Sequence, residues 1–164
     1  MRASNASSSP VRLASGSGLL RCPTSPPGPL RSWFARYHVL GQVAQGGVGT
    51  IHAGRDTTSG KRVAIKLLQP EHADSAEIVS RFLGELEVGL RVDHPGLVKI
   101  HDGGFMPDGN AAIVMDWIDG ASLAHTVGTP LPTDDVRAYG AQIASAIAAL
   151  HDAHVVHCDL KPEN

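Results

Sequence analysis

Short runs of β-branched and aliphatic residues, separated by turn residues, begin at Tyr37. The first run, Tyr37–Val43, leads into the glycine-rich segment Gly46–Gly49, and a second run covers Thr50–Gly54. Asp56–Gly60 has the Asp, Ser and Gly content of a turn, and Arg62–Leu68 is a third β-rich run. Runs joined in this way predict the strands of an antiparallel meander.

A helical period follows the third run. Asp74 with Glu77 three residues later resembles a capping box, so we expect the helix to begin there. Gly84 and Gly89 each cost about 1 kcal/mol of helix propensity relative to alanine, which indicates a helix held in place by packing. Its apolar stripe repeats every four residues: Ile78, Phe82, Leu86 and Leu90.

Two more strands and a second long helix are predicted downstream. The strands are Leu97–His101 and Ala111–Met115, joined through the turn residues Met106–Asn110. Thr133 or Asp134 can cap the second helix. The order predicts an α+β fold, in which a five-stranded antiparallel sheet with one inserted helix precedes the beginning of a helical unit. The second helix has one apolar face: Val136, Tyr139, Ile143, Ile147 and Leu150.

Composition divides the chain near residue 36. Residues 1–36 are rich in Ser, Pro and Gly and carry five Arg and no acid, which predicts a disordered leader. An organelle transit peptide or a start codon placed too far upstream would also explain this composition. Residues 37–164 carry nine Lys and Arg against sixteen Asp and Glu. The net charge of −2 provides no basic field, so we expect no nucleic-acid partner.

The sequence also limits the cellular location. No apolar run approaches the roughly 18 residues of a transmembrane helix, so we expect no membrane segment. Residues 1–30 lack the continuous apolar stretch of a secretory signal. Cys22 and Cys158 do not have the spacing of a disulfide framework or a zinc site. A reducing, cytoplasmic location is therefore expected.

The glycine-rich segment and a lysine beyond it are candidates for phosphate chemistry. Gly46–Gly49 between two strands would let backbone N–H groups approach an anion, although a plain glycine-rich hairpin explains the same residues. Lys66 leaves an apolar strand 17 residues after Gly49, and such a lysine is ordinarily a solvated charge. Glu85 borders the apolar stripe of the helix, where an unpaired carboxylate would be costly. We therefore predict a Lys66–Glu85 ion pair near the glycine loop.

Six segments in this order resemble the protein kinase family, and together they run from Tyr37 to Asn164. They are similar to the glycine-rich loop (Ala44–Ile51), the strand lysine (Val63–Lys66), helix C (Arg81–Glu85), the turn before strand four (His94–Val98), the hinge strand (Ile113–Ile118) and the catalytic loop (His157–Asn164). Lys161, two residues after Asp159, resembles the serine/threonine-specific version of the catalytic loop. The Arg81–Glu85 segment looks most like bacterial, eukaryotic-like kinases.

The resemblance implies a kinase-like domain at 37–164. Its N-lobe would cover about 37–116, its hinge about 116–120, and part of its C-lobe 121–164. It also implies transfer of the ATP γ-phosphate to Ser or Thr hydroxyls of a protein substrate, with Mg²⁺ as cofactor.

Residue roles follow from the matching motifs. Asp159 would accept the proton of the substrate hydroxyl or orient it, Lys161 would neutralise the transferring phosphoryl group, and Asn164 would bind Mg²⁺. Met115 would be the gatekeeper. Backbone groups of Asp116 and Ile118 would bond the purine edge. The full set expected at the nucleotide is Val43, Ala44, Gln45, Gly46, Gly47, Val48, Gly49, Ile51, Ala64, Lys66, Glu85, Met115, Asp116 and Ile118.

Departures from the family pattern narrow these implications. Ala44 replaces the first loop glycine, Asp116 replaces the more usual Glu, and Cys158 replaces the Arg before the catalytic Asp. That Arg pairs with a phosphorylated activation loop in the family, so this form of control is not implied here. The sequence stops before the Asp-Phe-Gly motif, and we expect a fragment truncated after the catalytic loop. A non-catalytic ATP-binding or interaction module is the alternative.

A histidine cluster suggests a competing metal site. His151, His154 and His157 recur every three residues beside Cys158 and Asp159. A helix end in this region would keep the three imidazoles from converging, so we expect no metal ion there. The kinase resemblance implies that His157 instead packs beneath the catalytic loop.

Overall fold

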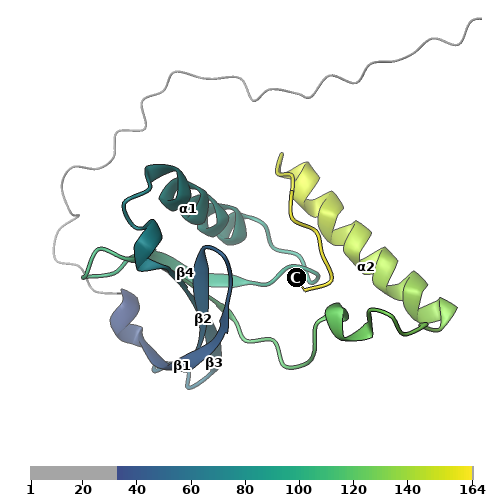
Figure 1. Cartoon of the computed structure of the whole chain (residues 1–164), viewed down its shortest axis with the longest axis horizontal. Helices are drawn as coiled ribbons and strands as arrows, with labels where there is room; N and C mark the ends of the chain where they lie inside the picture. The colour runs from purple at the N-terminus through teal and green to yellow at the C-terminus, as the bar shows by residue number, and fades with distance from the viewer. Residues whose placement is uncertain (1–32, 164) are drawn as a thin grey trace, which may run out of the picture. The chain divides into compact units, whose positions relative to one another are not determined.

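The computed structural model describes residues 33–163, within a compact unit that spans Arg31–Asn164 (Figure 1). Most of the leader predicted for residues 1–36 therefore lies outside the described residues. Its last four residues form the short 3-10 helix η1 (Trp33–Arg36).

A five-stranded antiparallel sheet forms the first part of the described chain, as the sequence predicts. Its order is β1-β2-β3-β5-β4, so β5 lies between β3 and β4. The central strands carry the most deeply buried side chains, among them Ile65, Leu68, Ile113 and Val114. The strands are β1 (Tyr37–Gln45), β2 (Gly49–Asp56), β3 (Arg62–Leu68), β4 (Ile100–Phe105) and β5 (Ala111–Asp116).

Helix α1 (Ala76–Arg91) packs on one face of this sheet through Ile78, Phe82 and Leu86 of its predicted apolar stripe, whereas Leu90, the last residue of that stripe, is exposed. Phe82 and Leu86 are buried there against Leu68, Ile100, Ala111 and Ile113. Gly89 allows the close approach, because a Cβ at this position would lie 2.6 Å from Cγ1 of Ile100. Packing on the sheet therefore fixes where α1 presents Glu85.

The other face of the sheet is organised around Tyr37. This ring packs with Val63, Ile65 and Val114 in a second core cluster. The Arg36 guanidinium just before it donates two hydrogen bonds to the buried Asp56 carboxylate, at 2.8 and 2.6 Å. That hydrogen bonding holds the pKa of Asp56 well below its usual range. The pair joins the end of η1 to the β2–β3 turn.

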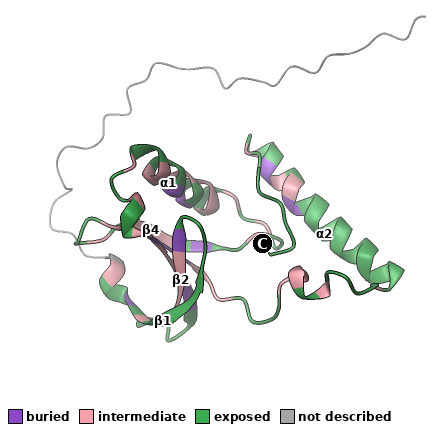
Figure 2. Ribbon diagram, in the orientation of Figure 1, coloured by how far each residue is buried: buried purple, intermediate pink, exposed green. Residues whose placement is uncertain are grey.

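Helix α2 (Thr133–Asp152) follows η3 (Leu123–Thr126) and buries much less of its surface (Figure 2). Ala146 and Leu150 are buried, whereas Val136, Tyr139 and Ile143 of the predicted apolar face are exposed. Nε2 of His94 lies 3.0 Å from Oγ of Ser145 and so connects the turn before β4 to α2. None of the helices at residues 33–163 is long and apolar enough to cross a membrane.

Three predicted boundaries are wrong. The fourth strand was expected at Leu97–His101, but the Leu97 N–H donates to the His94 carbonyl in a turn, and β4 begins at Ile100. Ser75 rather than Asp74 caps α1, since its side chain accepts the Ile78 N–H. Pro132 precedes α2 without a side-chain cap, so Thr133 and Asp134 belong to the first turn of the helix.

Candidate active site

The glycine-rich segment forms a tight loop between β1 and β2. β1 ends at Gln45, β2 begins at Gly49, and the Gly46 N–H donates to the Gly49 carbonyl at 2.8 Å. A Cβ at Gly49 would lie 2.7 Å from the Leu67 carbonyl oxygen, so a side chain at this position would collide with the backbone of β3. The predicted residues Val43, Ala44 and Gln45 end β1 beside this loop.

The predicted Lys66–Glu85 ion pair is present. Nζ of Lys66, on β3, donates to both carboxylate oxygens of Glu85, on α1, at 2.8 and 2.6 Å. The Lys66 side chain is 24% exposed, and its ammonium lies 5.5 Å from the centre of the Phe82 ring. Glu85 thus fixes the position of a positive charge at the edge of the core.

Four of the predicted nucleotide residues share one face of the sheet. Ile51 on β2 is directly opposite Lys66 on β3, and Ala64 on β3 is directly opposite Met115 on β5. Directly paired residues of neighbouring strands project from the same face, and alternate residues of a strand do so too. Ile51, Ala64 and Met115 therefore form an apolar floor beside the Lys66 ammonium.

The predicted hinge begins at the end of β5. The Asp116 N–H donates to the Lys99 carbonyl at 2.9 Å, and the Asp116 carboxylate accepts from Nε2 of His101 at 2.6 Å. Trp117 donates its indole N–H to Asp119 at 2.7 Å. Ile118 between them is 65% exposed. The Asp116 side chain is therefore bonded to His101 of the neighbouring strand β4.

The predicted catalytic loop holds an acid and a base in contact. Nζ of Lys161 lies 2.8 Å from Oδ2 of Asp159, and the hydrogen bond between them raises the pKa of Lys161. The Asp159 N–H donates to the His157 carbonyl at 2.9 Å, across Cys158, which has a φ of 60°. The expectation that His157 packs beneath the loop is wrong, because the side chain is exposed. Its ring instead lies beside the Asp159 N–H.

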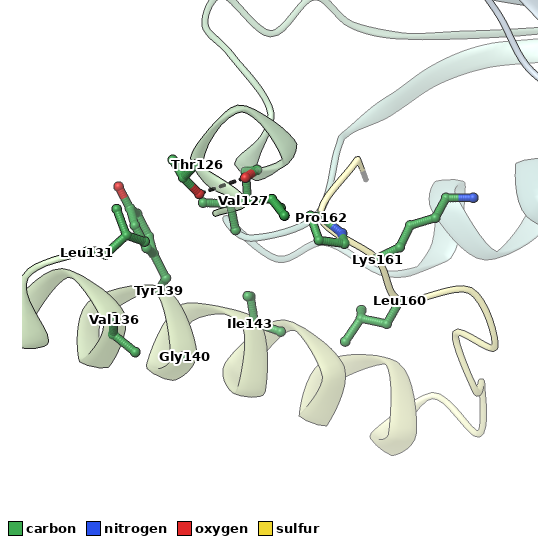
Figure 3. Close-up of a pocket in the computed structure, with 11 residues that line it drawn as sticks. Thr126, Val127, Leu131, Val136, Tyr139, Gly140, Ile143, Leu160, Lys161 and Pro162 are labelled. Atoms are coloured by element: carbon green, nitrogen blue, oxygen red, sulfur yellow. Dashed lines mark hydrogen bonds between the residues drawn. The ribbon is translucent and has the colours of Figure 1, made fainter. Parts of the chain in front are cut away.

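An open apolar groove of about 480 Å³ lies between this loop, η3 and α2. Figure 3 shows Leu160 directed towards α2 and Lys161 directed away from it. The Ala124 N–H donates to the Pro162 carbonyl at 3.0 Å and ties the loop to η3. Leu160, Lys161 and Pro162 all line the groove, and the Lys161 side chain extends away from α2.

The structure describes only some of the residues that the sequence analysis considered for metal binding. No group of three His, Cys, Asp or Glu side chains among residues 33–163 could hold a metal ion. The predicted Mg²⁺ ligand Asn164 and the thiol of Cys22 lie outside the described residues.

Two residues near the glycine loop were missed by the sequence analysis. Nε2 of Gln69 donates to the Gly46 carbonyl at 3.3 Å, and Nε2 of His72 lies 3.1 Å from the Gly47 carbonyl oxygen. Both belong to the connection between β3 and α1, which includes the 3-10 helix η2 (Pro70–His72). Residue type gives no signal for such contacts, since they reach carbonyls more than 20 residues away in the sequence.

Comparison with known protein families identifies the family of this chain. The protein kinase domain family matches residues 37–164, that is, the sheet, both α-helices and the predicted catalytic loop. The chain belongs to the protein kinase family. The family membership and the kinase-like fold predicted from the six motifs are thereby confirmed.

Relatives of this kinase chain are bacterial serine/threonine kinases. Serine/threonine-protein kinase pkn2 of Myxococcus xanthus is 38% identical over 131 residues, covering 79% of this chain and 16% of the relative. PrkC of Bacillus subtilis is 34% identical over 131 residues, covering 79% and 20%. A crystal structure of the Mycobacterium tuberculosis PknI kinase domain matches with a TM-score of 0.68 and 30% identity, covering 79% and 53%. The chain thus spans about a fifth of these curated relatives and about half of the solved domain.

Proposed function

We propose that this kinase chain binds ATP, as its magnesium complex, between the glycine loop and the hinge. We further propose that the whole protein transfers the γ-phosphate to Ser or Thr hydroxyls of a protein substrate. The observation that carries the proposal is the Lys66–Glu85 ion pair beside the glycine loop. A fixed ammonium next to a loop of backbone amides is suited to bind a polyphosphate.

The nucleotide is assigned to the face shared by Ile51, Ala64, Lys66 and Met115. Its adenine would pack on the three apolar side chains, and backbone groups of Asp116 and Ile118 would bond the purine edge. The α- and β-phosphates would then lie against Lys66.

The catalytic roles are assigned to Asp159 and Lys161. Asp159 would take the proton of the substrate hydroxyl as the hydroxyl oxygen bonds to the γ-phosphorus and the bond to the ADP oxygen breaks. Lys161 stays protonated because its pKa is raised, so it would neutralise charge on the transferring group. Asn164 is the proposed amide ligand of Mg²⁺. We propose that this reaction takes place in the cytoplasm.

Calorimetric titration of the 164-residue chain with MgATP tests the binding site. Lys66→Ala should abolish or strongly weaken binding, since it removes the positive charge and leaves Glu85 to repel the phosphates. Lys61→Ala, in the exposed β2–β3 turn, is the matched control and should bind as the parent does. Equal affinity in the parent and Lys66→Ala would refute the proposed nucleotide site.

Phosphate transfer from radiolabelled ATP to a mixed Ser/Thr substrate tests the catalytic roles in the whole protein. Asp159→Asn keeps the shape of the side chain and removes its basicity, so turnover should fall by at least about a hundredfold while ATP binding is retained. Transfer at the parent rate would exclude Asp159 as the base.

A further inference from the structure

The connection between β3 and α1 is hydrogen-bonded to one side of the glycine loop. The Gln69 backbone N–H donates to the Val48 carbonyl at 3.0 Å, and the Gln69 side-chain amide donates to the Gly46 carbonyl at 3.3 Å. Nε2 of His72 lies 3.1 Å from the Gly47 carbonyl oxygen. A carbonyl oxygen can only accept, so this histidine nitrogen carries the proton. Three successive loop carbonyls are thus bonded by two residues of one short segment.

Because peptide bonds are planar, these hydrogen bonds to the loop carbonyls also set the direction of the loop N–H groups. Peptide bonds are planar, and the described residues contain no cis peptide bond. In a trans peptide the N–H of the following residue points opposite to the carbonyl. Fixing the carbonyls of Gly46, Gly47 and Val48 therefore directs the N–H groups of Gly47, Val48 and Gly49 to the side of the loop away from the connection.

The same short segment also links the other two phosphate-binding elements. It begins directly after β3, which carries Lys66, and leads into α1, which carries Glu85. The position of the loop is thus set by the chain that joins the two charged residues. Gln69 and His72 are both half-buried, which limits the freedom of their side chains.

We propose that Gln69 and His72 are positioning residues that hold the glycine loop with its amides directed at the ATP phosphates. This inference rests on the proposed ATP site. The two side chains do not touch the nucleotide, and their effect passes through the loop backbone. They should therefore matter for a ligand with phosphates and not for one without.

Paired titrations of the 164-residue chain with MgATP and with adenosine separate this role from a general loss of structure. Gln69→Leu and His72→Phe keep side-chain bulk and remove the donor, and each should weaken ATP binding about threefold to tenfold, as the loss of one hydrogen bond implies. Adenosine affinity should change by less than about twofold. His72→Gln restores a donor and should recover most of the ATP affinity. His38→Phe, on exposed β1, is the matched control.

Hydrogen exchange of the loop amides gives a second readout that needs no ligand. Among these amides, the Gly46 N–H donates to the Gly49 carbonyl and closes the loop, so its exchange should accelerate in Gln69→Leu and His72→Phe and not in His38→Phe. Unchanged exchange, or equal losses of adenosine and ATP affinity, would overturn the positioning role. A parent chain that binds no ATP would overturn the proposed function, and loop exchange would still decide whether the two side chains hold the loop.

Discussion

Helix α1 contains two glycines for which the same substitution should have opposite effects. At Gly84 a Cβ would have no neighbouring atom within 4 Å, so Gly84→Ala adds helix propensity without a clash and should stabilise the fold by about 1 kcal/mol. At Gly89 the new methyl group would overlap Cδ1 of Ile100 and lie 2.6 Å from its Cγ1 and 3.2 Å from its Cβ. Ile100 is buried on β4 and cannot simply swing away.

The expected magnitude at Gly89 is the difference between two effects. The propensity gain is again about 1 kcal/mol, whereas overpacking a core typically costs about 1–3 kcal/mol. Gly89→Ala should therefore destabilise the fold by up to about 2 kcal/mol. Only the Gly89 methyl group meets β4, so Gly89→Ala and not Gly84→Ala should also displace α1. That displacement would move Glu85, which holds Lys66 in place.

Urea unfolding of the 164-residue chain, followed by circular dichroism, measures both effects. The midpoint should rise for Gly84→Ala and fall for Gly89→Ala. Ile100→Val removes the overlapping methyl group, so Gly89→Ala should cost less in the Ile100→Val background than in the parent. Two midpoints that both rise, or a Gly89→Ala cost that Ile100→Val does not reduce, would refute the close packing of α1 on β4.

Two further predictions concern the ends of the described unit. Asp56 has a lowered pKa beside Arg36, so its stabilising contribution is present above the unfolded pKa of about 3.9 and is lost as the pH falls below it. Asp56→Asn should lower stability at neutral pH and flatten the acid limb of the unfolding midpoint against pH. His94→Ala should speed hydrogen exchange in α2, because the contact with Ser145 is lost, and Ser145→Ala should add little to it.

Each of these two predictions has a result that would contradict it. An Asp56→Asn variant with the parent pH profile would show that the carboxylate contributes nothing through its charge. Additive effects of the His94 and Ser145 substitutions would show that the two side chains act separately.

The sequence could predict the features that depend on local pattern or on a strict requirement for pairing. The stripe of α1 and the apolar runs of β2, β3 and β5 are strong periodic signals. Glu85 borders that stripe, with its side chain 48% exposed, and Lys66 on the apolar strand β3 was the available cation. These two inferences together are enough to place the ion pair.

The remaining features depend on long-range contacts that residue type does not encode. The fourth strand was predicted too early in the sequence because Gly103 and Gly104 are poor strand residues. Gly103 fits in β4 because a side chain at this position would collide with Leu86. Ser75 and Asp74 are both good caps, and the direction from which the chain enters α1 chooses between them. The Gln69 and His72 contacts end on backbone carbonyls, which every residue possesses. The assigned roles of the nucleotide and catalytic residues stay predictions.

The sheet order has a consequence for how the domain assembles during synthesis. β5 completes the sheet by entering between β3 and β4, although it is made after both of them. Until Asp116 has emerged from the ribosome, β3 has an unpaired edge, and the side chains of Val63 and Ile65 lack their partner Val114. Lys66 and Glu85 could approach each other earlier, but the apolar floor beside them would still lack Met115 of β5. The nascent chain should therefore need protection from aggregation over this interval, and it should gain protease resistance in one late step.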